Sequence, residues 1–176
     1  MESADKSMAG VDAWWLCAGK FLLIFSALQM LYTSGQGTGV ERLLIETITV
    51  DSAAWVITHI NPHIAVLGIG REIIAPCGAL SILNGCDGSE ALLLLTAAIS
   101  AAPVSGGWRI VGLLTALPFV YVANQIRVVA LFFAHCFARD SFAFLHGYAA
   151  PSTIVIACGI FFLTWLQIGQ ARHITQ

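Results

Sequence analysis

Long apolar runs, broken by short polar stretches, restrict what this sequence can fold into. The first run, Ala13–Tyr32, has about the 20 residues that an α-helix needs to cross a bilayer. Charged side chains make up only 10% of the 176 residues, whereas soluble domains carry about 25%. Because so few charges cannot cover a water-facing surface, we expect the lipid bilayer to be the solvent. The sequence predicts one membrane-embedded domain over residues 1–176, with polar tails at 1–12 and 170–176.

Four segments are interpreted as transmembrane helices, which makes the predicted fold class an all-α polytopic membrane protein. The four segments are Ala13–Tyr32, Ala91–Ala102, Arg109–Phe137 and Ala149–Ile168. Val40–Ile60 mixes charged and apolar residues, and we interpret it as an interfacial amphipathic helix rather than a span. Its expected apolar stripe consists of Leu44, Ile48, Trp55 and Ile57. Residues 64–83 contain β-branched residues around two glycines, which predicts a small extracytoplasmic hairpin.

The expected topology places the functional residues on one side of the membrane. With the N-terminus in the cytoplasm, Cys86, the end of the span that contains Arg127, and His146 all reach the outer face. The distribution of Lys and Arg supports this orientation only weakly. If Val40–Ile60 also crosses the membrane, the side of these residues relative to the N-terminus is reversed.

The stretch NGCDGSEALLLL places a cysteine, Cys86, in a polar turn directly before an apolar helix. Asp87 is expected to cap that helix and Glu90 to complete a capping box. The positive end of the helix favours a thiolate, but the two carboxylates oppose this effect. Cys86 can therefore be a nucleophile that needs a further cation, an inert packing residue, or half of a disulfide with Cys77. The cysteines Cys17, Cys136 and Cys158 lie in apolar runs and are interpreted as packing residues.

Arg127 is the most informative charged residue, because it lies inside an apolar segment. Placing a guanidinium at the centre of a membrane helix costs at least about 2.5–3.5 kcal/mol, so such a residue normally faces a partner or a water-filled cavity. Asn124, three residues earlier, lies on the same helical face and also requires a polar setting. The alternative interpretation is that Arg127 extends to the lipid headgroups.

His146 precedes the last span and is the histidine that we expect to act as a base. A lone interfacial histidine is often structural, and His135 is a competing base. His59 and His63 have a spacing of four, but Asn61-Pro62 interrupts the helix between them. Because no third ligand follows, we predict neither a metal site nor a cofactor. The small net charge of −2 argues against a nucleic-acid partner.

A thiol, a guanidinium and an imidazole on one face are suited to acyl transfer. His146 could deprotonate Cys86 and later protonate the leaving amine. Arg127 could stabilise the thiolate or the oxyanion of a tetrahedral intermediate.

These residues, in this order, resemble the exosortase/archaeosortase family. The resemblance is carried by Cys86-Asp-Gly88, by Asn124-Gln-Ile-Arg127 and by His146, and it covers roughly Ile64 to Gln167. Histidine at the third position looks like the bacterial exosortases. The chain is shorter than the commonest exosortases and resembles a compact subfamily. Asp87 occupies a position that is often held by a small uncharged residue.

The resemblance implies a membrane cysteine peptidase or transpeptidase of the inner membrane, with its active site on the extracytoplasmic face. Cys86 would be the nucleophile, with Arg127 and His146 as the other catalytic residues and Asn124 supporting them. The implied partners are exported proteins that carry a C-terminal sorting signal, which is a short motif, a transmembrane helix and a basic tail, together with an acceptor. The alternative is a non-catalytic membrane subunit in which Asn124 and Arg127 form a polar contact between helices.

Overall fold

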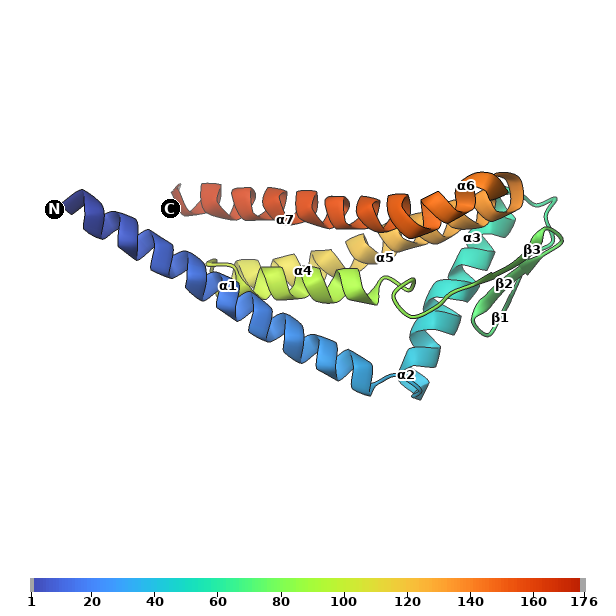
Figure 1. Cartoon of the computed structure of the whole chain (residues 1–176), viewed down its shortest axis with the longest axis horizontal. Helices are drawn as coiled ribbons and strands as arrows, with labels where there is room; N and C mark the ends of the chain where they lie inside the picture. The colour runs from blue at the N-terminus through green and yellow to red at the C-terminus, as the bar shows by residue number, and fades with distance from the viewer. Residues whose placement is uncertain (1, 175–176) are drawn as a thin grey trace.

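Three long helices and one short helix form the elongated body of the computed structural model. The structure describes residues 2–174, and the side chains of residues 14–171. The four helices are α1 (Glu2–Ser34), α4 (Ser89–Ala101), α5 (Gly106–Phe137) and α7 (Ala150–Ile174). Both ends of the chain lie at one end of this bundle, opposite the small β-sheet (Figure 1). The polar residues 2–12 form the first turns of α1 instead of the disordered tail expected from the sequence, and residues 170–174 continue α7.

Four helices are long and apolar enough to cross a bilayer, which confirms the prediction of a helical, polytopic chain at that level. They are Trp14–Ser34, Gly39–Ile60, Gly106–Phe137 and Arg139–Ala171. This set contains Gly39–Ile60 in place of the predicted span Ala91–Ala102. The predicted span Ala91–Ala102 corresponds to α4, whose 13 residues extend about 20 Å, less than the roughly 30 Å of a bilayer core.

The segment Gly39–Ile60 forms one helical rod that runs across the end of the bundle (Figure 1). It consists of α2 (Gly39–Arg42), the π-helix η1 (Leu43–Asp51) and α3 (Ser52–Ile60). It stands at a steep angle to α5 and α7 (Figure 1), and the interfacial helix stays a prediction. Length and composition alone would also permit a span.

The predicted apolar stripe of this rod is wrong in part. Ile48 and Trp55 are exposed, whereas Ile57 is fully buried. The reason is the π-helix, whose i→i+5 hydrogen bonds shift the register away from the 3.6-residue period that the prediction assumed. The buried positions are Glu41, Ile45, Thr49, Val50, Ala53, Ala54 and Ile57.

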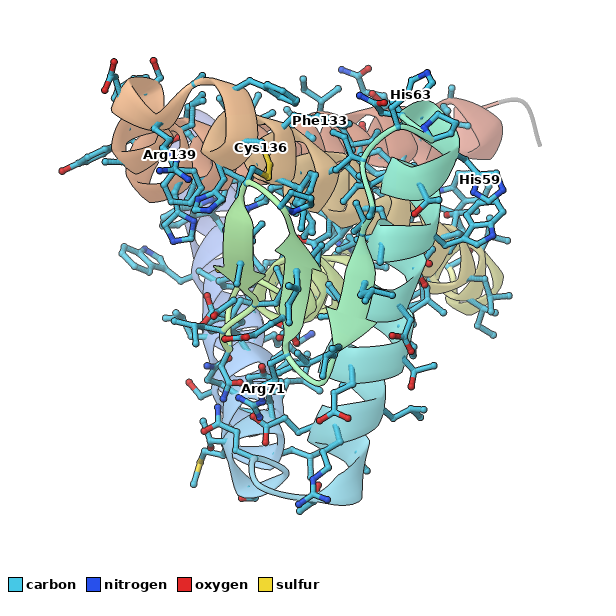
Figure 2. The ribbon with its side chains drawn as sticks, turned by 90° about the vertical axis from the view of Figure 1, so that its right-hand side faces the viewer. His59, His63, Arg71, Phe133, Cys136 and Arg139 are labelled. Atoms are coloured by element: carbon cyan, nitrogen blue, oxygen red, sulfur yellow. A yellow bond between two sulfur atoms is a disulfide. The ribbon has the colours of Figure 1, made fainter. Side chains whose placement is uncertain are left out.

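The predicted hairpin is extended by a third strand. Strands β1 (Leu67–Ile69), β2 (Glu72–Ala75) and β3 (Gly78–Ser81) form an antiparallel sheet in the order β1-β2-β3. Figure 2 looks onto this sheet, with Cys136 and Arg139 at one end of the strands and Arg71 at the other. The inner face of the sheet presents Ile73 and Leu80 to a core that also contains Ile45 and Phe132. The sheet thus caps the end of the bundle.

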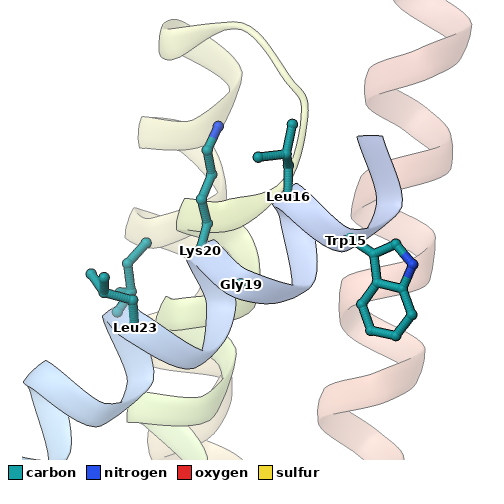
Figure 3. Close-up of a pocket in the computed structure, with 6 residues that line it drawn as sticks. Trp15, Leu16, Gly19, Lys20 and Leu23 are labelled. Carbon is teal, nitrogen blue, oxygen red and sulfur yellow. The ribbon is translucent and has the colours of Figure 1, made fainter. Parts of the chain in front are cut away.

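The remaining exposed surface of the helices is strongly apolar. The described part of α1 that could span a membrane has no buried residue, and Leu23 and Leu31 are 71% and 72% exposed. Figure 3 shows this surface around Gly19, with Leu16, Lys20 and Leu23 projecting from the helix. An apolar surface of this extent is typical of an interaction surface and is compatible with lipid contact. Lys20 can extend its amine from the helix toward a headgroup region.

A disulfide between Cys77 and Cys136 ties the sheet to the end of α5, and Figure 2 shows Cys136 beside the strands. Cys77 lies in the turn between β2 and β3, and Cys136 is the second-last residue of α5. The sequence-based interpretations of both cysteines are therefore wrong, since Cys77 does not pair with Cys86 and Cys136 is not a simple packing residue. Sequence alone could not select this pair, because the two cysteines are 59 residues apart and meet only after the sheet folds onto α5.

Replacing Cys136 by serine is expected to lower the free energy of unfolding by about 2–4 kcal/mol. The bond closes a loop of 59 residues, and loops of this length gain stability mainly because the unfolded chain is constrained. Thermal unfolding in detergent measures the effect, and a reductant should reproduce it in the wild-type protein but not in the variant. Cys17→Ser, which removes a free thiol on α1, is the control. An unchanged midpoint in Cys136→Ser would contradict the prediction.

Candidate active site

Cys86 lies in a tight turn between the sheet and α4. Its backbone N–H donates to the Leu83 carbonyl over 2.9 Å, and its side chain is half-buried against the core beneath the sheet. Gly85 and Gly88, on either side of it, have φ angles of +87° and +83°. Only glycine adopts this left-handed backbone without strain, so the two glycines fold the chain sharply around the thiol.

The carboxylate of Asp87 stabilises this turn, but not as the predicted helix cap. Gly88 occupies the N-cap position of α4 and makes no side-chain cap. Asp87 Oδ1 instead accepts hydrogen bonds from the Gly85 N–H and from the N–H and hydroxyl of Ser89. The predicted capping box is therefore wrong, because the left-handed Gly88 turns the chain before the helix begins. Asp87 Oδ2 also accepts a hydrogen bond from the Tyr32 hydroxyl on α1.

Arg127 approaches the turn from α5 and contacts the thiol. Its Nη2 is 3.8 Å from Cys86 Sγ, and its Nη1 is 3.4 Å from the Gly85 carbonyl oxygen. The guanidinium thus faces the turn before α4. Its Nε is buried and has no hydrogen-bond partner within the described chain. This cation is the additional positive group that the sequence required near Cys86.

Asn124 supports the same contact from one turn earlier on α5. Its side-chain amide donates to the Cys86 carbonyl over 3.2 Å, and its carbonyl oxygen is 3.5 Å from Arg127 Nη1. Asn124 is only 2% exposed. The partners of both side chains are in the turn before α4, not on a neighbouring transmembrane helix as in the alternative interpretation.

Gln125 is a structural residue that the sequence analysis missed. Its Nε2 donates to the carbonyl oxygens of Ile48 and Thr49, over 3.0 and 3.4 Å. These carbonyls belong to the π-helix η1, so Gln125 joins α5 to the transverse rod while Asn124 and Arg127 join it to the Cys86 turn. A polar residue next to Asn124 in an apolar segment was the available signal.

Gly88→Ala is expected to disrupt the turn. A Cβ at Gly88 would lie 2.9 Å from Asn124 Cβ and Cγ, in addition to the strain of a left-handed alanine. The backbone strain alone costs about 1–2 kcal/mol. The variant should unfold at lower temperature, and the accessibility of Cys86 to alkylation should change because Asn124 must move. Gly159→Ala is the control, since a Cβ there meets no atom within 4 Å and α7 favours alanine. Equal behaviour of the two variants would contradict this prediction.

Two histidines, His135 and His146, pack on the ring of Phe142 but have different surroundings. The ring of His146 stacks on Phe142 with centroids 5.5 Å apart, and the ring of His135 meets Phe142 edge-on at 5.3 Å. His135 Nε2 lies against Gly78, beside the disulfide. His146 Nδ1 is buried and lacks a hydrogen-bond partner in the described part of the molecule. His146 also lies in the π-helix η2 (Leu145–Ala149), and short π-helical turns often occur at functional sites.

The site residues thus fall into two groups. Hydrogen bonds join Cys86, Asn124 and Arg127 into one cluster. Among the described residues, no hydrogen bond or ion pair joins His146 to that cluster. Its neighbour Leu145, however, lines the same cavity as Arg127 and packs against the same core as Cys86. His146 therefore lies at the same end of the molecule as the cluster.

A second set of contacts holds the turn from the opposite side. Arg71, between β1 and β2, pairs with the buried carboxylate of Glu41 at 2.7 Å. Its Nη1 donates to Asn84 Oδ1, two residues before Cys86, over 3.3 Å. Glu41 also accepts a hydrogen bond from the Gly37 N–H in the loop after α1. The Cys86 turn is consequently fixed by α1, α2 and the sheet as well as by α5.

Comparison with known proteins gives no relative for this chain: no protein-family model, curated protein or solved structure matches it.

Proposed function

We propose that the chain is a membrane cysteine peptidase or transpeptidase that acts on exported proteins with a C-terminal sorting signal. The observation that carries the proposal is the contact between the Arg127 guanidinium and Cys86 Sγ, at 3.8 Å. The resemblance to the exosortase/archaeosortase motifs supplies the substrate class. Asn124 and the two left-handed glycines Gly85 and Gly88 also support the proposal. Asn124 is buried and hydrogen-bonded to the turn, and together with the glycines it fixes the Cys86 thiol relative to the Arg127 guanidinium.

The proposed reaction has two acyl-transfer steps. The Cys86 thiolate attacks the scissile carbonyl, and the negative charge moves to the carbonyl oxygen, where Arg127 can donate hydrogen bonds to it. When this intermediate collapses, the C–N bond breaks and the leaving amine takes the proton that His146 removed from the thiol. A thioester on Cys86 remains. An acceptor amine or water then attacks the thioester, and the thiol is regenerated.

Detection of the thioester tests this proposal directly. The purified protein in lipid vesicles is incubated with an exported protein that ends in a motif, an apolar helix and a basic tail. Mass spectrometry should find the upstream fragment attached to Cys86, and hydroxylamine should release it. Cleavage without an adduct, or an adduct on Cys17 or Cys158, would contradict the assignment of the nucleophile. A substrate left intact would favour the non-catalytic membrane subunit.

His146→Ala is expected to lower kcat by about 10²–10⁴-fold, the usual contribution of a general acid–base. His135→Ala is the matched control, because its ring also packs on Phe142 but lies beside the disulfide. Rates are measured with the same exported substrate, over a range of pH. If His135→Ala causes the larger loss, the two histidines exchange roles in the proposal.

The proposed site lies on the extracytoplasmic face of the inner membrane. The disulfide between Cys77 and Cys136 supports this side, because disulfides form and persist in oxidising compartments. The sheet that carries Cys77 caps the same end of the bundle as the Cys86 turn. A membrane-impermeant thiol reagent is applied to cells in which only the outer membrane has been permeabilised. It should label Cys86, whereas Cys158, which is 2% exposed, should stay unlabelled. Labelling of Cys86 only after the inner membrane is opened would reverse the topology.

A further inference from the structure

A closed ring of bonds and contacts links the Cys77–Cys136 disulfide to the candidate active site. Cys86 follows Cys77 by nine positions in the chain, and Cys136 follows Arg127 by nine positions along α5. At one end of this ring, the disulfide joins the two segments covalently. At the other end, Arg127 Nη2 lies 3.8 Å from Cys86 Sγ. The disulfide and the cation–thiol contact are therefore the two closures of one ring.

The two sides of the ring are short and regular. On one side, β3 begins directly after Cys77, and only residues 82–85 separate the end of β3 from Cys86. On the other side, α5 is continuous from Arg127 to Cys136, over about 14 Å at 1.5 Å per residue. This separation makes the backbone, and not contact between sulfur atoms, the route from the disulfide to Cys86.

The interior of the ring is packed, so a displacement at one end is transmitted to the other. Leu80 and Ile82, on the side of the sheet, belong to the same core as Val128 and Phe132 on α5. The Cys86 side chain packs against that core as well. Because protein interiors are close-packed and deform little, strand and helix move as units when the bond between them is removed.

The disulfide lies at the edge of this core and not inside it. Cys77 and Cys136 are both half-buried, and their neighbours Pro76 and Phe137 are exposed. Disulfides at exposed positions are more often labile or regulatory than disulfides in a core. The position of this bond therefore suits a bond that is made and broken in the folded protein.

Two basic side chains lie beside Cys77, and Figure 2 shows one of them, Arg139, next to Cys136 at the end of the strands. Arg139 Nη2 donates to the Cys77 carbonyl oxygen over 2.5 Å. His135 Nε2 lies 2.8 Å from the place that a Cβ on Gly78 would occupy. A cation near a cysteine stabilises the thiolate that leaves when a disulfide is attacked. These side chains therefore favour reduction with Cys77 as the leaving group.

We propose that the Cys77–Cys136 disulfide is a redox switch of the candidate active site, which a protein dithiol opens and thereby separates Arg127 from Cys86. One thiolate of the dithiol attacks Cys136 Sγ, the S–S bond breaks, and Cys77 leaves as a thiolate that takes up a proton. The second thiol of the dithiol then displaces Cys136, so the dithiol becomes a disulfide and both cysteines become thiols. The inference rests on the proposed function only for its effect on cleavage.

The alkylation rate of Cys86 tests the switch without any substrate. The starting protein carries Cys17→Ser and Cys158→Ser in lipid vesicles, so Cys86 is its only free thiol while the disulfide is closed. Dithiothreitol opens the disulfide and is removed before iodoacetamide is added, and peptide mass spectrometry follows the rate at Cys86 alone. The rate is measured with and without Arg127→Lys, in the closed and the open state.

The expected result is that the effect of Arg127→Lys depends on the disulfide. Arg127→Lys should slow alkylation in the closed state, and this slowing should be at least about fivefold smaller in the open state, the lower end of the usual coupling between two sites. Reoxidation should restore it. The Cys77→Ser/Cys136→Ser protein should behave as the open state and should not respond to dithiothreitol. Arg109→Lys, the matched control on α5, should leave the rate unchanged in both states.

The ratio of the two rates distinguishes a switch from a bond that only stabilises the fold. General loosening changes the rate by the same factor with and without Arg127→Lys, so an equal effect of the substitution in both states would overturn the proposal. An effect of dithiothreitol on the Cys77→Ser/Cys136→Ser protein would overturn it too, as would a reduced protein whose circular dichroism shows that it has unfolded. The coupling without any cleavage of an exported substrate would support the switch and refute the peptidase. Cleavage without the coupling would refute the switch alone.

Discussion

Cys86→Ala is expected to abolish cleavage of a substrate with a C-terminal sorting signal. The proposed reaction passes through a thioester on this sulfur, and the described chain holds its other free thiols, Cys17 and Cys158, outside the Arg127 cluster. Loss of a covalent nucleophile commonly removes about 10⁶-fold of kcat. Immunoblotting of the substrate in cells, and its cleavage by the purified protein, measure the effect.

The controls separate loss of chemistry from loss of fold. Cys86→Ala should unfold at nearly the wild-type temperature, because the side chain is small and half-buried. Cys17→Ala should retain wild-type cleavage. If Cys86→Ala still processes the substrate, the enzyme assignment fails and the non-catalytic subunit becomes the better interpretation.

Arg127→Lys is expected to lower kcat by about 10²–10³-fold, the usual effect of removing one donor from a developing oxyanion. Lysine keeps the positive charge but not the planar group that reaches Cys86 Sγ, the Gly85 carbonyl and Asn124 together. The alkylation rate of Cys86 should fall as well, since the thiol loses its cation. Both quantities are measured on the protein in vesicles.

Arg109→Lys is the matched control for this change. Arg109 also lies in α5, but its guanidinium donates to the backbone carbonyls of Ala102 and Val104 at the far end of the helix. Its replacement should leave kcat and the alkylation rate of Cys86 unchanged. Equal losses in the two variants would indicate a general effect on α5 and would argue against a catalytic contact.

The local pattern of the chain predicted most of the architecture. Apolar runs of membrane-spanning length at 13–32, 109–137 and 149–168 correspond to α1, α5 and α7. The charge pattern of Val40–Ile60 indicated an amphipathic helix that differs from the apolar spans. The structure places this helical rod across the end of the bundle (Figure 1). The buried face of that rod was not predictable, because the rod is π-helical over Leu43–Asp51 and its Ile48 and Thr49 carbonyls accept hydrogen bonds from Gln125 on another helix.

The sequence by itself determined the apolar, helical character of this protein and the chemical groups available to it. Three features can be recognised from the sequence without a fold: the small fraction of charged residues, an arginine inside an apolar segment, and a cysteine between two glycines. The tertiary structure decided which groups meet. The packing of the elements pairs Cys77 with Cys136 in a disulfide and leaves Cys86 as a free thiol. Cys86 lies beside Arg127, although the two residues are 41 positions apart in the chain. The physical reason is that membrane helices, sheet and turns are set by local periodicity, whereas disulfide partners and cation–thiol contacts depend on how those elements pack.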